Sequence, residues 1–399
     1  MKYVWFVLFF SVLIFSGCGK DGLLEDNDID DNYLANKYPP LPPGETSPDA
    51  VVARLEKYLS QKDFENFFQY RFGTDKWAEI AKDHHQILLP DRHDYYSYDN
   101  FKRAVWELAY FVYEIEYRIE SWNNAPGYSW RSTVTNKATN VTTVIYEEPE
   151  FYEPWNTVKP ILKVTVDYGS FLGEGSDNDR SREIAGVLAN FVQETSGGTG
   201  GNPGQPGYVP LDRETKGLFH NEEMGLVGDT SGAYVQESAD WPPQPGHSYH
   251  GRGPKQISYN FNYGLCSAII YGDKMVLLKN PELIVEQNPP GGDPVYGNIG
   301  GVLGFKTAIW FWMTPQDQKP SCHEVMLPTW KPNASQEKVG WKWGLGATIM
   351  VINGGAEGGL AENVDFRVGT RVRAYRMFAE KMGADITGEK LDTFGMGSL

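Results

Sequence analysis

The chain has 399 residues, more than an average domain, and its 41% hydrophobic and 14% aromatic content is enough to form a sizeable core. Its net charge of −16 argues against a nucleic-acid partner, because neutralising phosphates requires clustered Lys and Arg. An acidic surface does not exclude a neutral glycan, and 12 Trp and 23 Tyr suit the packing of sugar rings on aromatic faces.

The first 18 residues indicate a targeting signal. Lys2 gives a positive start, and residues 4–15 form a nearly unbroken apolar run that ends in Ser-Gly-Cys at Cys18. The run is too short to span a bilayer comfortably and ends in small residues, as a cleaved signal peptide does. Because small residues before a cysteine resemble the bacterial lipobox, we expect Cys18 to carry a lipid that anchors an exported bacterial lipoprotein at the outer membrane or cell surface. A signal peptide without lipidation is the alternative.

Residues 19–48 predict a tether between this signal and a folded domain. The segment is rich in Asp and Glu as far as Asp31 and then in proline. Such a composition buries too little apolar surface to fold, and the prolines stiffen it. We therefore expect one globular domain over residues 49–399.

The globular part is predicted to be mainly helical, because apolar residues recur there at helical spacing. The periodic segments predict helices over 100–117, 177–194, 301–313 and 364–381. Ser176 and Asp179 form a capping box at the start of the second helix, which a glycine-rich loop at 197–207 terminates.

Residues 120–172 predict an insertion that is partly β. The segments 133–146 and 161–166 are rich in β-branched residues, which favour strands. The aromatic residues of this insertion either extend a binding surface or pack it onto the core.

Several motifs then occur in a recognisable order. The two longest are YHGRGPKQISYNFNYG at 249–264 and LGFKTAIWFWM at 303–313. Shorter ones are YSYDNF at 96–101, QETSGG at 193–198, INGGAE at 352–357 and RVGTR at 367–371. Together they resemble the motifs of glycoside hydrolase family 19, the plant-type endochitinases. The resemblance covers about 50–395, interrupted by the 120–172 insertion.

The resemblance implies a mainly α, lysozyme-like fold of two lobes with a glycan cleft between them. It also implies an endo-acting, inverting hydrolase of β-1,4-linked N-acetylglucosamine polymers such as chitin, in which one carboxyl protonates the leaving oxygen and another activates water. We expect a monomer that needs no cofactor. The seven His residues do not complete a metal site with neighbouring carboxylates, so no metal is expected.

Glu194 matches the family's general acid. It also ends the 177–194 helix, where the helix dipole disfavours negative charge, and it lies beside that helix's apolar face. Both effects are expected to keep the carboxyl protonated, as an acid working near neutrality requires.

The matching general base lies in the segment KGLFHNEE at 216–223. Counting from Gly217 selects Glu223, which we favour, whereas counting from Phe219 selects Glu222. In a local helical turn neighbouring side chains point about 100° apart, so only one of the two glutamates is expected to face the cleft. Ser258 matches the residue that holds the attacking water together with the base.

Arg371 falls within the apolar stripe of the 364–381 helix. A guanidinium there is expected to be partly buried and to require carboxylate partners. Glu357 and Glu194 are the candidates, and the resemblance pairs them with Arg371. Such a cluster would orient and tune the acid.

Polar and aromatic positions that match the family's sugar-contacting residues complete the predicted site, because hydroxyl and acetamido groups need directional partners. These residues are Trp241, Gln256, Asn260, Asn262, Lys319 and Asn353. Gln193 and Phe261 depart from the His and Tyr usual in the family, which bears on fine specificity.

Apart from Cys18, the chain contains only Cys266 and Cys322. A cysteine pair in an exported protein forms either one disulfide or two buried thiols. Both positions match cysteines of some family members, so the resemblance favours a disulfide between them.

Two other functions remain open at this point. One is a muramidase-like enzyme that cleaves peptidoglycan, since that polymer shares the β-1,4 N-acetylhexosamine backbone. The other is a non-catalytic glycan-binding lipoprotein, against which the intact set of Glu194, Ser258 and Glu357 argues.

Overall fold

The computed structural model describes residues 38–81, 93–118, 129–197, 213–286, 293, 295–297, 299–316 and 319–399. The predicted signal peptide with Cys18, most of the tether and most of the 197–207 loop lie outside the described residues. Within the described residues, no helix combines the length and apolar character needed to cross a bilayer.

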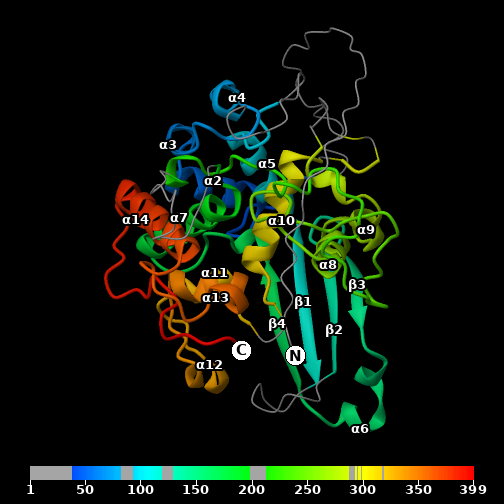
Figure 1. Ribbon diagram of the computed structural model, residues 1–399. Helices are drawn as coiled ribbons and strands as arrows, with labels where there is room; N and C mark the ends of the chain where they lie inside the picture. The colour runs from blue at the N-terminus through cyan, green and yellow to red at the C-terminus, as the bar shows by residue number, and fades with distance from the viewer. Residues whose placement is uncertain are drawn as a thin grey trace, which may run out of the picture.

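The fold is a helical body from which one β-sheet projects (Figure 1). The helices are α2 (Pro48–Tyr58), α3 (Gln61–Phe67), α4 (Asp75–Ala81), α5 (Tyr98–Leu108), α6 (Pro154–Thr157), α7 (Asp177–Thr195), α8 (Asn260–Tyr271), α9 (Met275–Lys279), α10 (Gly301–Met313), α11 (Cys322–Val325), α12 (Ala334–Lys338), α13 (Leu345–Glu357) and α14 (Phe366–Met382). The strands are β1 (Phe111–Arg118), β2 (Ser129–Asn136), β3 (Val141–Glu147) and β4 (Ile161–Asp167). The predicted mainly α fold with a partly β insertion is confirmed.

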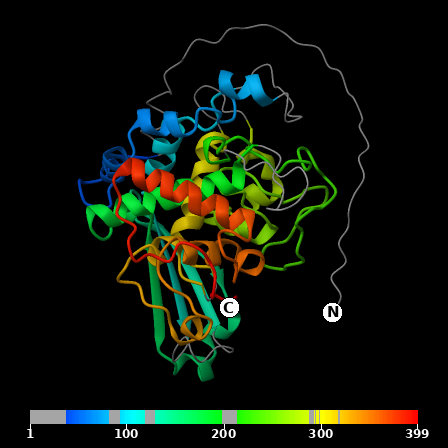
Figure 2. The ribbon, with the colours of Figure 1, turned by 60° about the vertical axis from the view of Figure 1, so that its left-hand side comes forward.

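The helical core is built around α7, α10 and α14. The capping box of Ser176 and Asp179 starts α7, as predicted, and α14 packs alongside this helix (Figure 2). Every residue of α10 is buried, and its charged side chain, Lys306, forms a buried ion pair with Glu107 at 2.7 Å. Asp365 caps α14 through the N–H groups of Arg367 and Val368, so Val364 lies before the helix and is exposed.

The predicted helix over 100–117 is wrong in its second half. The helix α5 ends at Leu108, and 111–118 form the strand β1. In β1 the buried residues alternate with less buried ones, which is the period of a strand and not of a helix. Val112 lies four residues after Leu108, so it also fits the helical spacing of the apolar residues in α5. The sequence pattern therefore does not reveal where the helix ends and the strand begins.

The sheet is antiparallel, with strand order β3-β2-β1-β4. β1 is an inner strand because it pairs with β2 on one side and β4 on the other. The sheet extends away from the helices, and α6 lies at its far end (Figure 1). The edge strand β3 is largely exposed.

The end of the predicted tether belongs to the folded body. Tyr38 is buried and packs edge-on against Trp106. The backbone carbonyl of Tyr38 accepts a hydrogen bond from the Tyr110 hydroxyl at 3.1 Å. Lys137 donates to the carbonyl of Thr46. The folded part therefore begins earlier than residue 49.

The predicted disulfide is wrong, because Cys266 and Cys322 are free buried thiols. The Cys266 thiol has Lys306 as its charged neighbour, whereas Lys255 and Arg371 lie near Cys322. The two thiols thus occupy different surroundings. Burial raises the pKa of both, that of Cys322 to about 12, so both remain protonated at neutral pH.

The assignment of 111–118 to a strand predicts unequal effects of two truncations in the sheet. Ile115 is 3% exposed on β1, and Ile115→Ala should lower the free energy of unfolding by about 2–5 kcal/mol. Val144 is 54% exposed on β3, and Val144→Ala should change it by no more than about 0.5 kcal/mol. Urea denaturation measures both, and equal effects would contradict the alternation.

Candidate active site

A cavity of about 480 Å³ lies among the segments that carry the sequence motifs. This volume falls in the range of ~300–1,000 Å³ typical of ligand sites. Its lining combines two carboxylates, one ammonium group and several amides. The lining residues are Gln193, Glu194, Glu223, Tyr234, Gly251, Lys255, Gln256, Ile257, Ser258, Tyr259, Asn262, Phe311, Ile352 and Asn353.

Glu194 lies in the last turn of α7, and its side chain is 19% exposed. Its Oε1 accepts hydrogen bonds from Lys255 Nζ at 3.0 Å and from Arg371 Nη2 at 2.8 Å. Burial by itself raises the pKa of this carboxyl, but the charges of Lys255 and Arg371 outweigh burial and hold the pKa below its ordinary value. The expectation that the surroundings of Glu194 raise its pKa is therefore wrong, because two cations from other segments reach the carboxyl.

Arg371 lies at the centre of a buried cluster, with 1% of its side chain exposed. Its Nε and Nη2 donate to the two oxygens of Glu357 at 3.1 and 3.0 Å, and its Nη1 donates to Asn190 Oδ1 at 2.7 Å. The predicted pairing of Arg371 with both Glu357 and Glu194 is confirmed.

Asn353 joins this cluster to the cavity. Its backbone departs from helical geometry inside α13, with φ −145° and ψ 35°. Its Nδ2 donates to Glu357 Oε1 at 2.9 Å, and the residue lines the cavity. At the kink in α13, the Asn353 side chain thus contacts both the buried ion pairs and the cavity.

Glu223 lines the same cavity as Glu194. Its Oε1 accepts a hydrogen bond from the Tyr234 hydroxyl at 2.8 Å, and its Oε2 accepts one from the backbone N–H of Gly251 at 3.0 Å. These two donors hold a carboxylate and leave it accessible from the cavity.

Glu222 points elsewhere. Its Oε1 lies 2.7 Å from His250 Nε2 and 3.1 Å from Arg252 Nε, and it is not among the lining residues. The backbone of Glu222 forms a β-bridge with Arg252, so the segment is extended and successive side chains point to opposite sides. The backbone at Glu222 is therefore extended and does not form the expected helical turn. Only one of the two glutamates, Glu223, faces the cavity, as predicted.

The tight turn at 253–259 and the start of α8 bring Gln256, Ser258 and Asn262 to the cavity. Gln256 Nε2 donates to the Gly253 carbonyl at 2.9 Å, Ser258 Oγ donates to the Gln256 carbonyl at 3.1 Å, and Asn262 Nδ2 donates to the Ser258 carbonyl at 2.9 Å. Gln256 adopts a left-handed backbone, with φ 51°. Each of these side chains is therefore held by a hydrogen bond to the backbone carbonyl of a residue two to four positions earlier.

Two amide oxygens on the cavity have no hydrogen-bond partner among the described residues. They are Gln193 Oε1 and Asn262 Oδ1. Leaving a buried acceptor unpaired costs about 1–3 kcal/mol, so a ligand that donates to these oxygens gains the compensating bonds.

Three predicted sugar-contacting residues do not line the cavity. Asn260 is buried, and its amide bonds to the backbone of Gln236 and of Trp241, so its role is to hold a loop. Trp241 packs over Gly264, where a Cβ would lie 2.6 Å from the indole. Lys319 donates to the Val351 carbonyl at 3.2 Å and lines a separate pocket.

Lys255 and Tyr234 line the cavity but are not among the site residues predicted from the sequence. Lys255 is part of the 249–264 motif, and a lysine between Pro254 and the polar residues of this glycine-rich motif is a usable signal of a charged group at the site. Tyr234 lies in a loop whose sequence contains no comparable signal. Among the described residues, no group of three His, Cys, Asp or Glu side chains is arranged to hold a metal ion.

The family model described as "Chitinase class I" matches residues 151–393. The chain is 40% identical over 242 residues to the basic 30 kDa endochitinase of Solanum lycopersicum, covering 58% of this chain and 65% of that protein. It is 37% identical over 230 residues to chitinase 1 of Oryza sativa subsp. japonica, covering 57% and 62%. The chain thus spans less than two thirds of the length of these relatives.

Solved structures with detectable similarity include chitinase C from Streptomyces griseus HUT6037, at 26% identity and a TM-score of 0.38, with 56% of this chain and 83% of that chain covered. The class IV family 19 chitinase of Zea mays has 26% identity and a TM-score of 0.37, with 56% and 80% covered.

Proposed function

The chain belongs to the family 19 chitinases, and from this premise we propose that it is an endo-acting, inverting hydrolase of β-1,4-linked N-acetylglucosamine polymers such as chitin. In this proposal Glu194 is the general acid and Glu223 the general base. The observation that carries it is that these two carboxyls, and not Glu222, line one open cavity.

Inverting hydrolysis uses two carboxyls on opposite faces of the sugar. Glu194 protonates the leaving glycosidic oxygen, while Glu223 removes a proton from a water that attacks the anomeric carbon from the other face. Tyr234 and Gly251 hold the Glu223 carboxylate ready for this water. Ser258, on the same cavity, serves as a further partner for it.

The unpaired amide oxygens support an N-acetylated substrate. Gln193 Oε1 and Asn262 Oδ1 are acceptors that need donors. A pyranose with hydroxyl and acetamido N–H groups supplies donors of this kind. Gln256 and Asn353 add further amide groups to the same cavity.

A general acid acts in its protonated form, whereas at Glu194 the charges of Lys255 and Arg371 outweigh the effect of burial and lower the pKa. Of the two cations, Lys255 lines the cavity, whereas Arg371 is held behind it by Glu357. We propose that the incoming substrate displaces water and separates the Lys255 ammonium from the carboxyl. Both changes raise the pKa of Glu194.

Replacing the carboxyls tests the assignment. Glu194→Gln and Glu223→Gln should each lower kcat on soluble chitin oligomers by about 10²–10⁴-fold, because each removes one proton transfer. Glu222→Gln should have a much smaller effect, since the amide oxygen can still accept from Arg252. Unchanged turnover in Glu194→Gln would refute the assignment of Glu194 as the general acid.

The charge of Lys255 should control the pH dependence. Lys255→Met removes a positive charge that lowers the pKa of Glu194, so the acid stays protonated to higher pH. The alkaline limb of the kcat/KM profile, which reports the free enzyme, should move to higher pH. Lys338→Met, on the exposed helix α12, should leave the limb in place. A limb that is unmoved in Lys255→Met would contradict the role of Lys255.

Product analysis on chitin oligomers and on purified peptidoglycan sacculi tests the substrate. We expect cleavage of chitin oligomers with inversion at the anomeric carbon, visible by NMR during early turnover. Cleavage of sacculi alone would indicate a muramidase-like enzyme. Binding of oligomers without turnover would indicate a non-catalytic glycan-binding protein.

We further propose that the protein is exported and anchored as a bacterial lipoprotein through Cys18, and that it acts as a monomer. The support for export and lipidation is the apolar run at 4–15 that ends in Ser-Gly-Cys. Cys18→Ser should move the protein from the membrane fraction to the soluble fraction on cell fractionation. Cys266→Ser, in the folded body, should not. Membrane retention of Cys18→Ser would argue against lipidation, and light scattering measures the oligomeric state.

A further inference from the structure

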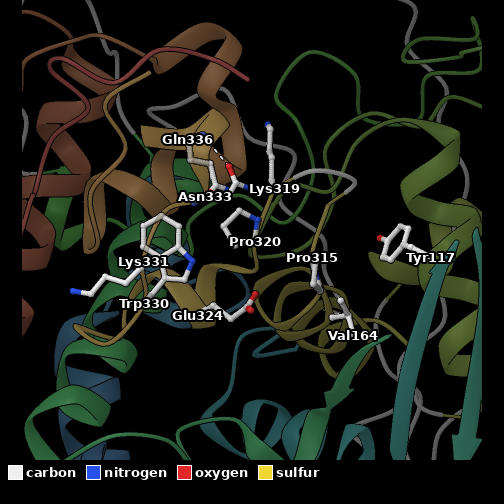
Figure 3. Close-up of a pocket in the computed structure, with 10 residues that line it drawn as sticks. All are labelled: Tyr117, Val164, Pro315, Lys319, Pro320, Glu324, Trp330, Lys331, Asn333 and Gln336. Atoms are coloured by element: carbon white, nitrogen blue, oxygen red, sulfur yellow. Dashed lines mark hydrogen bonds between the residues drawn. The ribbon is translucent and has the colours of Figure 1, made fainter. Parts of the chain in front are cut away.

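A second hollow of about 170 Å³ lies between the projecting sheet and the helical body. We call it the Trp330 pocket. Its lining residues are Tyr117, Val164, Pro315, Lys319, Pro320, Glu324, Trp330, Lys331, Asn333 and Gln336. Figure 3 shows Trp330 and Tyr117 on opposite sides of the group, with Pro320 and the Glu324 carboxyl between them.

The chemistry of the Trp330 pocket suits a sugar ring. The half-buried indole of Trp330 offers an apolar face with a polar N–H at its edge. Glu324 Oε2 accepts the N–H and hydroxyl of Ser321 at 2.8 and 2.9 Å, and its Oε1 takes part in neither bond. The exposed Lys331 adds a donor. An aromatic face flanked by donors and an acceptor matches the alternating CH and OH surfaces of a pyranose.

A neighbouring hollow of about 200 Å³ shares Trp330 and Lys331 and is also lined by Trp343. Trp343 is half-buried, and the Arg182 guanidinium lies 4.8 Å from its ring. Each hollow is smaller than the ~300–1,000 Å³ that encloses a compact small-molecule ligand. Two shallow hollows joined at one tryptophan suit a chain molecule that lies along the surface.

The Trp330 pocket and the active-site cavity lie on the same two segments of the chain. Phe311 lines the cavity, and Pro315, just beyond the end of α10, lines the pocket. Lys319 lines the pocket and donates to the Val351 carbonyl, directly before the cavity residue Ile352. A polymer that extends from the cavity across Pro315 and Lys319 would reach the pocket.

We propose that the Trp330 pocket is an accessory binding site for further saccharide units of the same N-acetylglucosamine polymer, outside the active-site cavity. The inference rests on the proposed function for the identity of the polymer. It gives the sheet a role, because Tyr117 of β1 and Val164 of β4 form one side of the pocket, and β1 lies outside the residues matched by the family model.

Chain-length dependence tests this site. Trp330→Ala should raise KM for a chitin octamer about three- to tenfold, the size expected for the loss of one aromatic platform. It should leave KM and kcat for the tetramer unchanged, because the shorter chain has fewer units to place outside the cavity. Trp330→Phe should restore most of the octamer affinity. Trp155→Ala removes a tryptophan that is 57% exposed on α6 at the far end of the sheet, and it should alter neither substrate.

Tetramer turnover measured on the same sample shows that Trp330→Ala is folded. Equal changes for tetramer and octamer, or no change for either, would overturn the accessory site. Calorimetric binding of both oligomers to Glu194→Gln, with and without Trp330→Ala, separates the two proposals. If no oligomer is hydrolysed by the unmodified enzyme but Trp330→Ala still weakens octamer binding selectively, the proposed hydrolysis fails and the accessory site stands.

Discussion

The buried guanidinium of Arg371 connects the helices that build the site. Arg371 on α14 binds Glu357 on α13 and both Asn190 and Glu194 on α7. Removing one partner of a buried ion pair costs on the order of 3–5 kcal/mol, because it leaves a charge without compensation. The positions of these helices and the position of the proposed acid are therefore set by the same bonds, and Asn353 extends the arrangement to the cavity.

The same charges oppose the chemistry that the site is proposed to perform. Burial lowers the pKa of Arg371, but Glu357 and Glu194 outweigh this and raise it above its ordinary value, so the guanidinium stays charged. A fixed cation beside Glu194 favours the carboxylate, whereas an acid catalyst needs the proton. The second cation, Lys255, belongs to the cavity wall, whereas Arg371 is buried. In the proposed mechanism, substrate therefore acts on the contact between Lys255 and Glu194.

The projecting sheet is joined to the body through aromatic contacts. Tyr117, Trp130 and Tyr146 stack in succession across β1, β2 and β3, with ring centroids 6.4 and 4.1 Å apart. Tyr146 then stacks on Trp241 at 6.4 Å, and the Trp241 carbonyl accepts a hydrogen bond from Asn260 at the start of α8. The stack runs from the side chain that lines the Trp330 pocket to the loop that precedes the 249–264 motif. This continuous stack ties the projecting sheet to the helical body.

The sequence alone predicted several of the long helices, because burial of one face repeats every 3.6 residues wherever a helix packs on a core. Periodicity therefore predicted α7, α10 and α14, and the stripe of α14 predicted that Arg371 would need carboxylate partners. Periodicity failed at β1, where Val112 fits both periods.

Only the tertiary structure placed Glu223 and not Glu222 on the cavity, separated the two cysteines and brought two cations to Glu194. Each of these depends on groups distant in the chain, such as the β-bridge to Arg252 and the approach of Lys255 to Glu194. Local sequence fixes where the backbone coils, but a pKa or a side-chain direction depends on charges and partners that folding brings from elsewhere.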